Sequence, residues 1–370
     1  MAAFERAFAE YCGAKHALAV NSGTAALHLA LEATGIEGGD LVITTPYTFT
    51  ATAEVVRYLG ADPLFVDVDP KTYLIEPARI DDLCRRECRR DGGRLVHRAS
   101  GRPVKAIVPV HVAGSPCDMD AIQATADAFG LAVVEDAAHA LPTVYRDRRI
   151  GAGRNLCMFS FYATKSLPSG EGGMVTTNDD GMAQRIKMMR VHGITRDVWD
   201  RYQSATAKWF YEVAAPGFKY NLSELAAAIG IHQLRKVDRF HQRRQAIARR
   251  YTGAFADVAG LTCPRELPGT AHAWHLYIVG VAAAAGGRDR FIAKMARRGI
   301  GTSVHFIPLH LHPYYRDRYG FRPEDFPNAL RAYQDAVSLP IYTRMTDGDV
   351  ERVIDAARAS ARVAGGGRPD

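Results

Sequence analysis

Short apolar runs rich in β-branched residues alternate with amphipathic stretches over the first two thirds of the chain. A short apolar run bounded by turn-forming residues predicts a strand, and apolar residues that recur every three or four positions predict a helix. The resulting βαβ rhythm predicts an α/β fold, with a mainly parallel central sheet flanked by helices. The expected strands are Ala17–Val20, Leu41–Thr44, Pro63–Val66, Val104–Pro109, Leu131–Glu135, Leu156–Ser160 and Met174–Thr177, and the helices between them include Ala25–Ala33, Ala51–Tyr58 and Met119–Phe129.

The pattern changes after Asn221, where one long helical stretch is expected from Ser223 to about Ala254. Strand-like and helix-like segments then follow without the βαβ rhythm, which predicts a smaller α+β domain. We therefore expect a large domain over residues 1–240 and a small C-terminal domain over residues 241–370. The elements expected in the small domain are a strand at Trp274–Val281, a helix around Arg288–Arg298, a strand near Thr302–Ile307 and a terminal helix over Asp347–Val363.

Composition and charge are those of a globular protein with anionic partners. The 370 residues are 47% hydrophobic and 24% charged, and 47 Lys and Arg stand against 40 Asp and Glu, a net charge of +7. Such an excess suits either nucleic acid or a phosphorylated small molecule. The basic residues are scattered, apart from an Arg-rich run between Cys84 and Arg102, which is expected to be a helix end that continues into a solvated surface insertion. We therefore expect no nucleic-acid partner.

The six cysteines and the N-terminus indicate a cytoplasmic protein. No two cysteines form a CxxC motif, so reduced structural thiols are expected rather than disulfides or a metal site. The first residues carry charges where a signal peptide needs an apolar stretch, and no apolar run approaches the roughly 18 residues of a membrane span. We expect a cytoplasmic location and no membrane partner.

Three features carry candidate chemistry, and each also has a plain structural explanation. Asn21–Thr24 follows an expected strand and begins a helix, which suits a phosphate but is also an ordinary helix N-cap. Asp136 ends an apolar strand, where its carboxylate needs a cationic partner such as a protonated pyridine nitrogen or an arginine. Lys165 lies among hydroxyls and glycines after another strand, where it is either a Schiff-base nucleophile or a solvated surface lysine. Together the three features match pyridoxal 5′-phosphate, which needs a phosphate site, a carboxylate for its ring nitrogen and a lysine for its aldehyde.

Longer stretches of the chain match a known family, and they occur in the family's order. These stretches are Asn21–Leu29, Thr45–Ala53, Val66–Pro70, Val108–Gly114, Val134–Ala140, Ser160–Gly173, Gly217–Ala228 and Val304–Tyr315. With them the chain resembles the DegT/DnrJ/StrS aminotransferases, the sugar-nucleotide branch of the fold type I enzymes that use pyridoxal 5′-phosphate. The resemblance implies the aspartate aminotransferase-like fold type I and a homodimer with shared active sites.

The resemblance also implies roles for individual residues. Lys165 matches the lysine that bonds to the cofactor and carries the proton between cofactor and substrate, and Asp136 matches the aspartate that keeps the pyridine nitrogen protonated. His139 stands where the family has a side chain beside the phenolic oxygen of the cofactor. Phe49 matches the aromatic residue that stacks on the ring, although an aromatic side chain there would serve equally as core. The implied phosphate contacts are Gly23 and Thr24 through backbone amides, Ser160 through its hydroxyl, and Asn221 from the neighbouring subunit.

The segment from His305 to Tyr315 holds three histidines, but their spacing on a Pro-containing extended segment does not suit a metal site. The resemblance implies instead that His310 and Tyr314 lie near a sugar nucleotide, with Lys219 and His305 as further candidates. The implied reaction moves an amino group from L-glutamate, which leaves as 2-oxoglutarate, to the keto carbon of a nucleotide-diphosphate keto-sugar. A UDP- or dTDP-4-keto-sugar is the expected acceptor.

Three other functions stay open on the sequence. Relatives that dehydrate deoxysugars replace the cofactor lysine by histidine, so Lys165 argues against that reaction. Transamination of a carbocyclic or other keto substrate is compatible with the same motifs. A regulatory cofactor-binding protein is disfavoured because Lys165, Asp136 and the phosphate residues occur together.

The chain also begins at an expected helix over Phe4–Tyr11, whereas family members usually carry a segment before it, so we expect altered substrate contacts.

Overall fold

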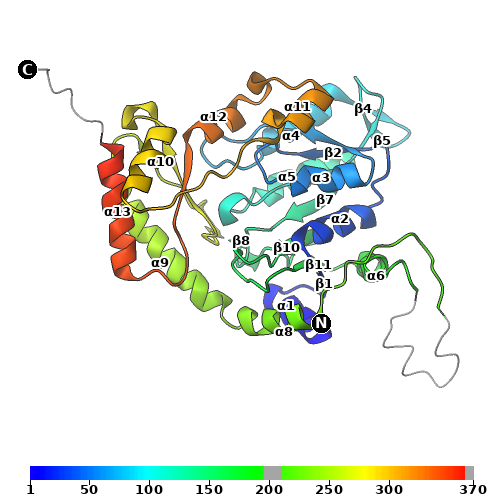
Figure 1. The fold of residues 1–370 in the computed structure, drawn as a ribbon. Helices are drawn as coiled ribbons and strands as arrows, with labels where there is room; N and C mark the ends of the chain where they lie inside the picture. The colour runs from blue at the N-terminus through cyan, green and yellow to red at the C-terminus, as the bar shows by residue number, and fades with distance from the viewer. Residues whose placement is uncertain (196–210, 363–370) are drawn as a thin grey trace, which may run out of the picture.

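The computed structural model describes residues 1–195 and 211–362, and a nine-stranded sheet lies at its centre (Figure 1). Its strands are β1 (His16–Val20), β2 (Leu41–Thr44), β3 (Asp62–Phe65), β4 (Cys88–Asp91), β5 (Arg94–His97), β6 (Pro103–Val108), β7 (Ala132–Asp136), β10 (Leu156–Ser160) and β11 (Gly173–Thr177). Seven of them follow the order β1-β11-β10-β7-β6-β2-β3, while β4 and β5 form a hairpin that joins β6. Pairing is parallel from β10 through β7, β6 and β2 to β3, and β11 runs antiparallel to both neighbours. The predicted mainly parallel sheet is confirmed.

Helices cover both faces of this sheet because successive strand residues point to opposite sides. The helices are α1 (Ala2–Cys12), α2 (Gly23–Ala33), α3 (Ala51–Tyr58), α4 (Pro77–Asp82), α5 (Met119–Phe129), α6 (Asp180–Met189) and α8 (Glu224–Leu234). On β2, Val42 packs in one apolar cluster with α2, α3 and α6, and the next residue, Ile43, packs in another with α4 and α5. At the β1 end of the sheet, α1 and α8 cover the second face through residues such as Phe8 and Ala227.

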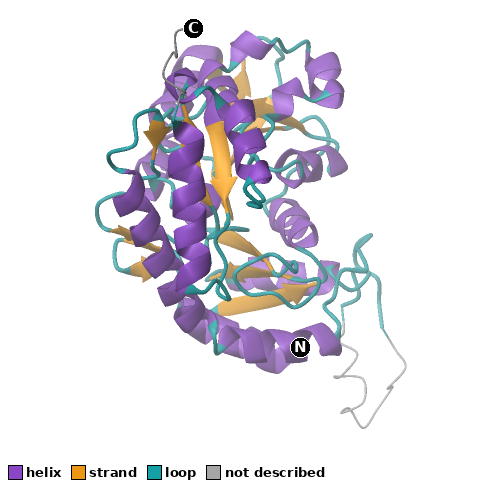
Figure 2. Cartoon of the chain, turned by 60° about the vertical axis from the view of Figure 1, so that its left-hand side comes forward, coloured by secondary structure: helices purple, strands orange, loops and turns teal. Residues whose placement is uncertain are grey.

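The C-terminal part forms the predicted smaller α+β unit. Its elements are α9 (Val237–Phe255), β12 (Leu261–Thr262), β14 (Tyr277–Val281), α10 (Arg288–Arg297), β15 (Ala336–Leu339) and α13 (Asp347–Ala361). The three strands form an antiparallel sheet in the order β12-β14-β15, and α9, α10 and α13 share one apolar cluster with it. Figure 1 shows α9 leading from α8 into this unit, and Figure 2 shows helices beside its strands. The boundary predicted at residue 240 falls inside α9 and stays a prediction.

Shorter elements connect these parts. They are β8 (Val144–Tyr145), β9 (Arg148–Arg149) and β13 (Thr270–Ala271), which form a second small sheet, the helices α11 (Pro313–Tyr319) and α12 (Pro327–Asp335), and the 3₁₀ turns Val112–Gly114, Ala283–Ala285, Leu309–Leu311 and Pro323–Asp325. Although α11 and α12 lie late in the chain, Tyr315 and Ala329 pack in the same cluster as Ile43 of the central sheet. The C-terminal segment therefore returns to cover the large sheet.

Three predicted elements of the C-terminal part have different limits in the structure. The expected single helix after Ser223 is two helices, because Lys236, with φ −105°, interrupts the helical geometry between α8 and α9. The strand expected from Trp274 begins only at Tyr277, because Trp274 has a positive φ of 51°. The terminal helix ends at Ala361, and position 363 of its predicted range lies outside the described residues.

The strand predicted near Thr302–Ile307 is wrong. The segment forms a single bridge, between Ser303 and Ser338, and then leaves the small sheet. Tertiary contacts hold it there: the imidazole of His305 bonds to the Ser338 hydroxyl at 2.8 Å, and Tyr47 donates its hydroxyl proton to the His305 carbonyl at 2.5 Å. The segment therefore bridges the two parts of the molecule instead of continuing a sheet.

The Arg-rich run has the predicted exposed arginines, but it is a hairpin and not the expected solvated loop. It forms a π-helical turn, Leu83–Glu87, followed by the β4–β5 hairpin, whose second strand pairs with the start of β6. The apolar side chains of Cys88, Leu95 and Val96 are buried, while Arg89 and Arg90 are exposed. The run is thus an amphipathic extension of the central sheet.

The described residues contain no helix with both the length and the apolar character needed to cross a bilayer. Within the same residues, no three or more His, Cys, Asp or Glu side chains gather in a way that could hold a metal ion. All six cysteines are free, and five of them are buried.

Candidate active site

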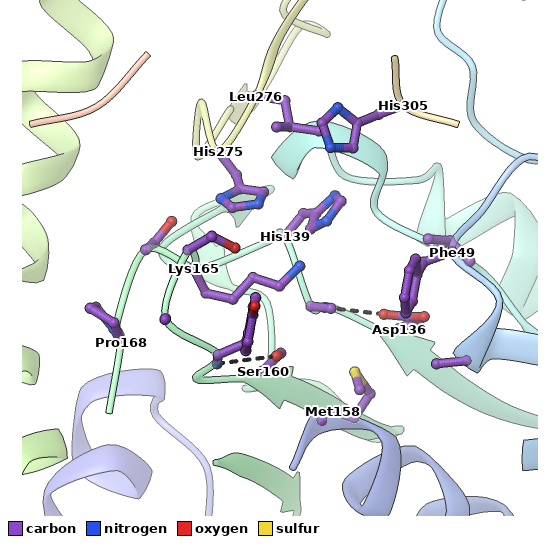
Figure 3. Close-up of a pocket in the computed structure, with 18 of the residues that line it drawn as sticks. Phe49, Asp136, His139, Met158, Ser160, Lys165, Pro168, His275, Leu276 and His305 are labelled. Carbon is purple, nitrogen blue, oxygen red and sulfur yellow. Dashed lines mark hydrogen bonds between the residues drawn. The ribbon is translucent and has the colours of Figure 1, made fainter. Parts of the chain in front are cut away.

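A cavity of about 830 Å³ opens at the carboxyl ends of the parallel strands. Ligands of α/β sheets bind at this edge because the loops that follow the strands converge there. Asp136 comes from the end of β7, Ser160 from the end of β10, and Lys165 from the loop that follows β10 (Figure 3). The C-terminal part closes the other side with residues that include His275 and His305. The cavity therefore lies between the two parts of the chain.

One end of the cavity has the amide and hydroxyl donors that a phosphate site needs. Ser22 caps helix α2, and its hydroxyl accepts the N–H of Ala25 at 3.0 Å. The N–H groups of Gly23 and Thr24 donate to no acceptor in the described residues, and both residues line the cavity together with Ser160. Free amide donors at a helix N-terminus attract anions, and the helix dipole adds to this attraction.

Gly23 leaves room that a side chain would fill. A Cβ atom at this position would lie 2.8 Å from the Cβ and 3.0 Å from the Oγ of Ser160. Replacing Gly23 with alanine is therefore expected to displace the Ser160 hydroxyl and weaken phosphate binding by about tenfold. Titration of the apoprotein with pyridoxal 5′-phosphate measures the effect. Gly253→Ala, in open space on α9, is the matched control, and an equal loss in both variants would contradict the assignment.

Asp136 is buried and held rigidly. Its Oδ2 accepts the hydroxyl of Thr52 at 2.8 Å, and its Oδ1 accepts the backbone N–H of Ala138 at 3.1 Å. Thr52 in turn shares a 2.8 Å hydrogen bond with Thr48, so a chain of hydroxyls leads to the carboxylate. Phe49 stands beside Asp136 in Figure 3 and is 62% exposed. A buried carboxylate with neutral hydrogen-bond donors still has the charge to hold a cationic ring nitrogen.

Lys165 points its amine into the cavity (Figure 3). Burial lowers the pKa of this amine from 10.5 to about 8, although the negative charge of Asp136 acts in the opposite direction. A lysine with such a pKa keeps a usable fraction of neutral amine near pH 7, as a nucleophile or proton carrier requires.

Three histidines around Lys165 are neutral. Burial is the main cause of the lowered pKa values of His139, His275 and His305, and the charge of Lys165 adds to it in each case. The ring of His139 lies 4.4 Å from that of His275 and stacks on Phe306. Its Nδ1 accepts the N–H of Ala113 at 3.3 Å, which leaves the proton on Nε2. His139 can therefore donate one hydrogen bond without adding charge.

The structure brings together most, but not all, of the residues predicted to form the site. Asn221 lines a second, smaller cavity with Ser169, Leu225 and Ile229, and Lys219 contacts the Asn221 side chain. Glu171 lines both this smaller cavity and the main cavity. Within one chain, however, neither Asn221 nor Lys219 lines the main cavity, which holds Lys165.

The two residues predicted closest to the sugar nucleotide also lie outside the main cavity. His310 is fully buried, and its Nε2 lies 3.3 Å from the carbonyl oxygen of Pro323. Tyr314 is exposed and accepts a hydrogen bond from Arg57 at 3.3 Å. Within this chain, neither residue lines the main cavity, whereas His305, the weaker candidate, does.

Sequence reasoning missed Thr52, His275 and Arg244, all of which line the cavity. The sequence did contain a signal for Thr52. It lies three residues after Phe49 and four after Thr48, at the start of a helix. Arg244 gave no local signal, and both Arg244 and His275 come from the C-terminal part and reach the cavity only through the tertiary fold.

Comparisons with known proteins agree with this chemistry. A profile of the DegT/DnrJ/EryC1/StrS aminotransferase family matches residues 1–358. The spore coat polysaccharide biosynthesis protein SpsC of Bacillus subtilis is 46% identical over 359 residues, which cover 96% of this chain and 88% of SpsC. The structure of DesV from S. venezuelae has a TM-score of 0.85 at 34% identity, covering 98% of this chain and 89% of DesV.

Two further structures extend the likeness. PseC of Helicobacter pylori, an aminotransferase involved in the biosynthesis of pseudoaminic acid, has a TM-score of 0.85 at 27% identity and covers 97% of this chain and 90% of PseC. Spr1654 of Streptococcus pneumoniae, known in a PLP form, has a TM-score of 0.84 at 26% identity, covering 97% of this chain and 90% of Spr1654. The phosphate donors, Asp136 and Lys165 of the present cavity fit the same cofactor. Because the family profile spans residues 1–358, the chain belongs to the DegT/DnrJ/EryC1/StrS family and is an aminotransferase that depends on pyridoxal 5′-phosphate.

Proposed function

We propose that the protein transfers an amino group from L-glutamate to the keto carbon of a nucleotide-diphosphate keto-sugar, with a UDP- or dTDP-4-keto-sugar as the acceptor. The observation that carries the proposal is the Lys165 amine, with its lowered pKa, in the same cavity as Asp136. SpsC is named for spore coat polysaccharide biosynthesis and PseC for pseudoaminic acid biosynthesis, which supports a sugar acceptor. The net charge of +7 suits an anionic nucleotide substrate, and we place the protein in the cytoplasm.

Each group of the cavity has a distinct task in this reaction. When bound, pyridoxal 5′-phosphate supplies the aldehyde and the electron-withdrawing ring. The amides of Gly23 and Thr24 and the Ser160 hydroxyl would hold its phosphate, and Asp136 would hold its ring nitrogen. Lys165 moves a proton at Nζ, which its pKa of about 8 permits near neutral pH. His139 keeps its proton on Nε2 and donates it as a hydrogen bond toward the cavity.

We also propose a homodimer in which the partner completes the site. Apolar side chains on α8 are unusually exposed, with Leu225 81% and Ile229 48% accessible, and they line the smaller cavity with Asn221. Exposed apolar residues beside a functional cavity are typical of a protein interface. Covering this face with a second copy would bring Asn221 toward the phosphate end of the neighbouring site, as the family resemblance implies.

The dimer can be tested by placing a charge on α8. Leu225→Arg is expected to convert the protein from dimer to monomer in analytical ultracentrifugation, and to weaken cofactor binding because the partner's Asn221 is lost. Ala124→Arg, at an exposed position on α5, adds the same charge elsewhere. A wild-type monomer, or an unchanged dimer in the Leu225 variant, would contradict the proposal.

The transfer reaction is tested in its two halves. We expect L-glutamate to change the visible absorbance of the cofactor-loaded protein and to yield one equivalent of 2-oxoglutarate. A panel of UDP- and dTDP-4-keto-sugars is then added, and mass spectrometry detects the amino sugar. A carbocyclic ketone serves as the comparison acceptor. If only the carbocycle is aminated, the acceptor is assigned wrongly, and if glutamate leaves the spectrum unchanged, the donor is wrong.

A further inference from the structure

The Val112–Gly114 turn, which follows β6, connects His139 to the C-terminal part of the chain. In its middle, Ala113 has a positive φ of 59°, a strained conformation that persists only where surrounding contacts hold it. The N–H of Ala113 donates to Nδ1 of His139 at 3.3 Å. Its carbonyl oxygen accepts the N–H of His275 at 3.0 Å and that of Leu276 at 3.3 Å. Ala113 therefore contacts the imidazole on one side and a cavity-lining segment of the C-terminal part on the other.

Gly114 packs tightly between the two parts of the molecule. Its carbonyl oxygen accepts the Thr143 hydroxyl at 2.7 Å and the N–H of Ala273 at 2.9 Å. Its φ is 98°, and a Cβ atom here would lie 2.7 Å from the Cβ of Ala273 and 2.8 Å from the carbonyl oxygen of His139. Both distances are shorter than van der Waals contact allows. Only glycine therefore fits at this position without moving His139 or the C-terminal segment.

The state of His139 matters because its ring lies near the reacting amine. Figure 3 shows the rings of His139 and His275 side by side near the Lys165 amine, and the two ring centroids are 4.4 Å apart. Burial, followed by the charge of Lys165, lowers the pKa of His139 well below its usual value, so the ring is neutral and carries one N–H. The hydrogen bond at one ring nitrogen determines whether the other nitrogen carries that proton.

We propose that Ala113 is a positioning residue for His139, and that the C-terminal part holds Ala113 in place through the backbone amides of His275 and Leu276. The Ala113 N–H occupies Nδ1 of the imidazole, so Nε2 keeps the proton and directs it into the cavity. The phenolic oxygen of the bound cofactor is the acceptor that the family resemblance implies for this donor. The inference concerns the cofactor alone, so it does not depend on which amino donor or acceptor the enzyme uses.

The tautomer of His139 can be read in the apoprotein by nitrogen NMR of isotope-labelled histidines, with His139→Gln identifying the signal. In the wild type we expect one neutral tautomer, protonated on Nε2, between about pH 6 and 8. Gly114→Ala should push the turn away from the imidazole, so that the proton is shared between both ring nitrogens. Gly101→Ala is the matched control, because it places an alanine at a φ of 67° in open space and should leave His139 unchanged.

The cofactor-loaded protein gives a second readout that needs no substrate. A hydrogen bond from Nε2 to the phenolic oxygen disperses negative charge that would otherwise hold a proton on the neighbouring lysine nitrogen. Weakening this bond in Gly114→Ala should move the pH midpoint of the visible absorbance change upward by about 1 pH unit, in the same direction as His139→Leu. Ala273→Val presses on the turn from the C-terminal part and should move the midpoint in the same direction, whereas Gly101→Ala should not move it.

Three results would overturn the inference. A proton on Nδ1 of His139 in the wild-type apoprotein would show that Ala113 is not its hydrogen-bond donor, and this measurement decides the question even if the variants do not fold. Lowered melting temperatures in Gly114→Ala and Ala273→Val with an unchanged tautomer and absorbance midpoint would reduce the turn to a structural joint. An equal change in Gly101→Ala would assign the effect to a general loss of stability.

Discussion

Replacing Lys165 with alanine is expected to reduce amino transfer by about 10⁴-fold or more, because we propose that this one side chain both bonds to the cofactor and moves the proton. Lys165 is the single lysine among the described residues that line the main cavity. Its neighbours cannot replace it, because His139 and His275 are neutral and buried and lack the amine that bonds to an aldehyde. The variant should still bind pyridoxal 5′-phosphate through the phosphate end and Asp136, but without the absorbance of the lysine-bound form.

The pH dependence of the wild type tests the same assignment. Only neutral amine attacks the cofactor aldehyde, and the pKa of Lys165 is lowered from 10.5 to about 8. Below this pKa the neutral fraction falls tenfold per pH unit, so the rate at which apoprotein bonds the cofactor should rise from pH 6 to about 8 and then level off. A rate that keeps rising to about pH 10 would show an ordinary surface lysine. Lys71→Ala, at an exposed position outside the main cavity, is the control and should keep the wild-type profile.

The parts of the site that the sequence predicted well are those encoded locally. Asp136 ends β7 and Lys165 lies in the loop after β10, and parallel strands bring such positions to one edge of the sheet. Gly23 begins a helix after another strand. The βαβ pattern alone therefore predicts that Lys165, Asp136 and Gly23 lie at the same edge of the sheet.

The parts that the sequence did not predict depend on long-range contacts. Arg244 and His275 come from the C-terminal part, and no local motif indicates which side of α9 or which turn faces the cavity. His310 appeared to belong to the substrate site only by resemblance, yet in this chain it packs beneath the surface against Pro323. The β4–β5 hairpin was predicted to be a loop because exposed arginines dominate its sequence, and its buried apolar positions are few: Cys88, Leu95 and Val96.

Removing the charge of Asp136 should impair catalysis more than cofactor binding. Asparagine has nearly the same shape, and its amide can still accept the Ala138 N–H while Thr52 turns its hydroxyl to accept the new N–H. The fold and the phosphate site should therefore persist, while the ring nitrogen loses the negative charge that keeps it protonated. We expect kcat to fall by about 10²- to 10³-fold, with a much smaller change in cofactor affinity.

The matched control is Glu135→Gln, which removes the same charge one residue earlier. Glu135 is equally buried but does not line the cavity; it pairs with His111 at 3.1 Å and accepts the Asn155 amide at 2.9 Å. Because the charge of Asp136 raises the pKa of Lys165, Asp136→Asn should also move the alkaline limit of the bonding rate to lower pH, whereas Glu135→Gln should leave it in place. An equal loss of kcat in both variants would mean that a buried charge supports the fold, and not the ring nitrogen, at this strand end.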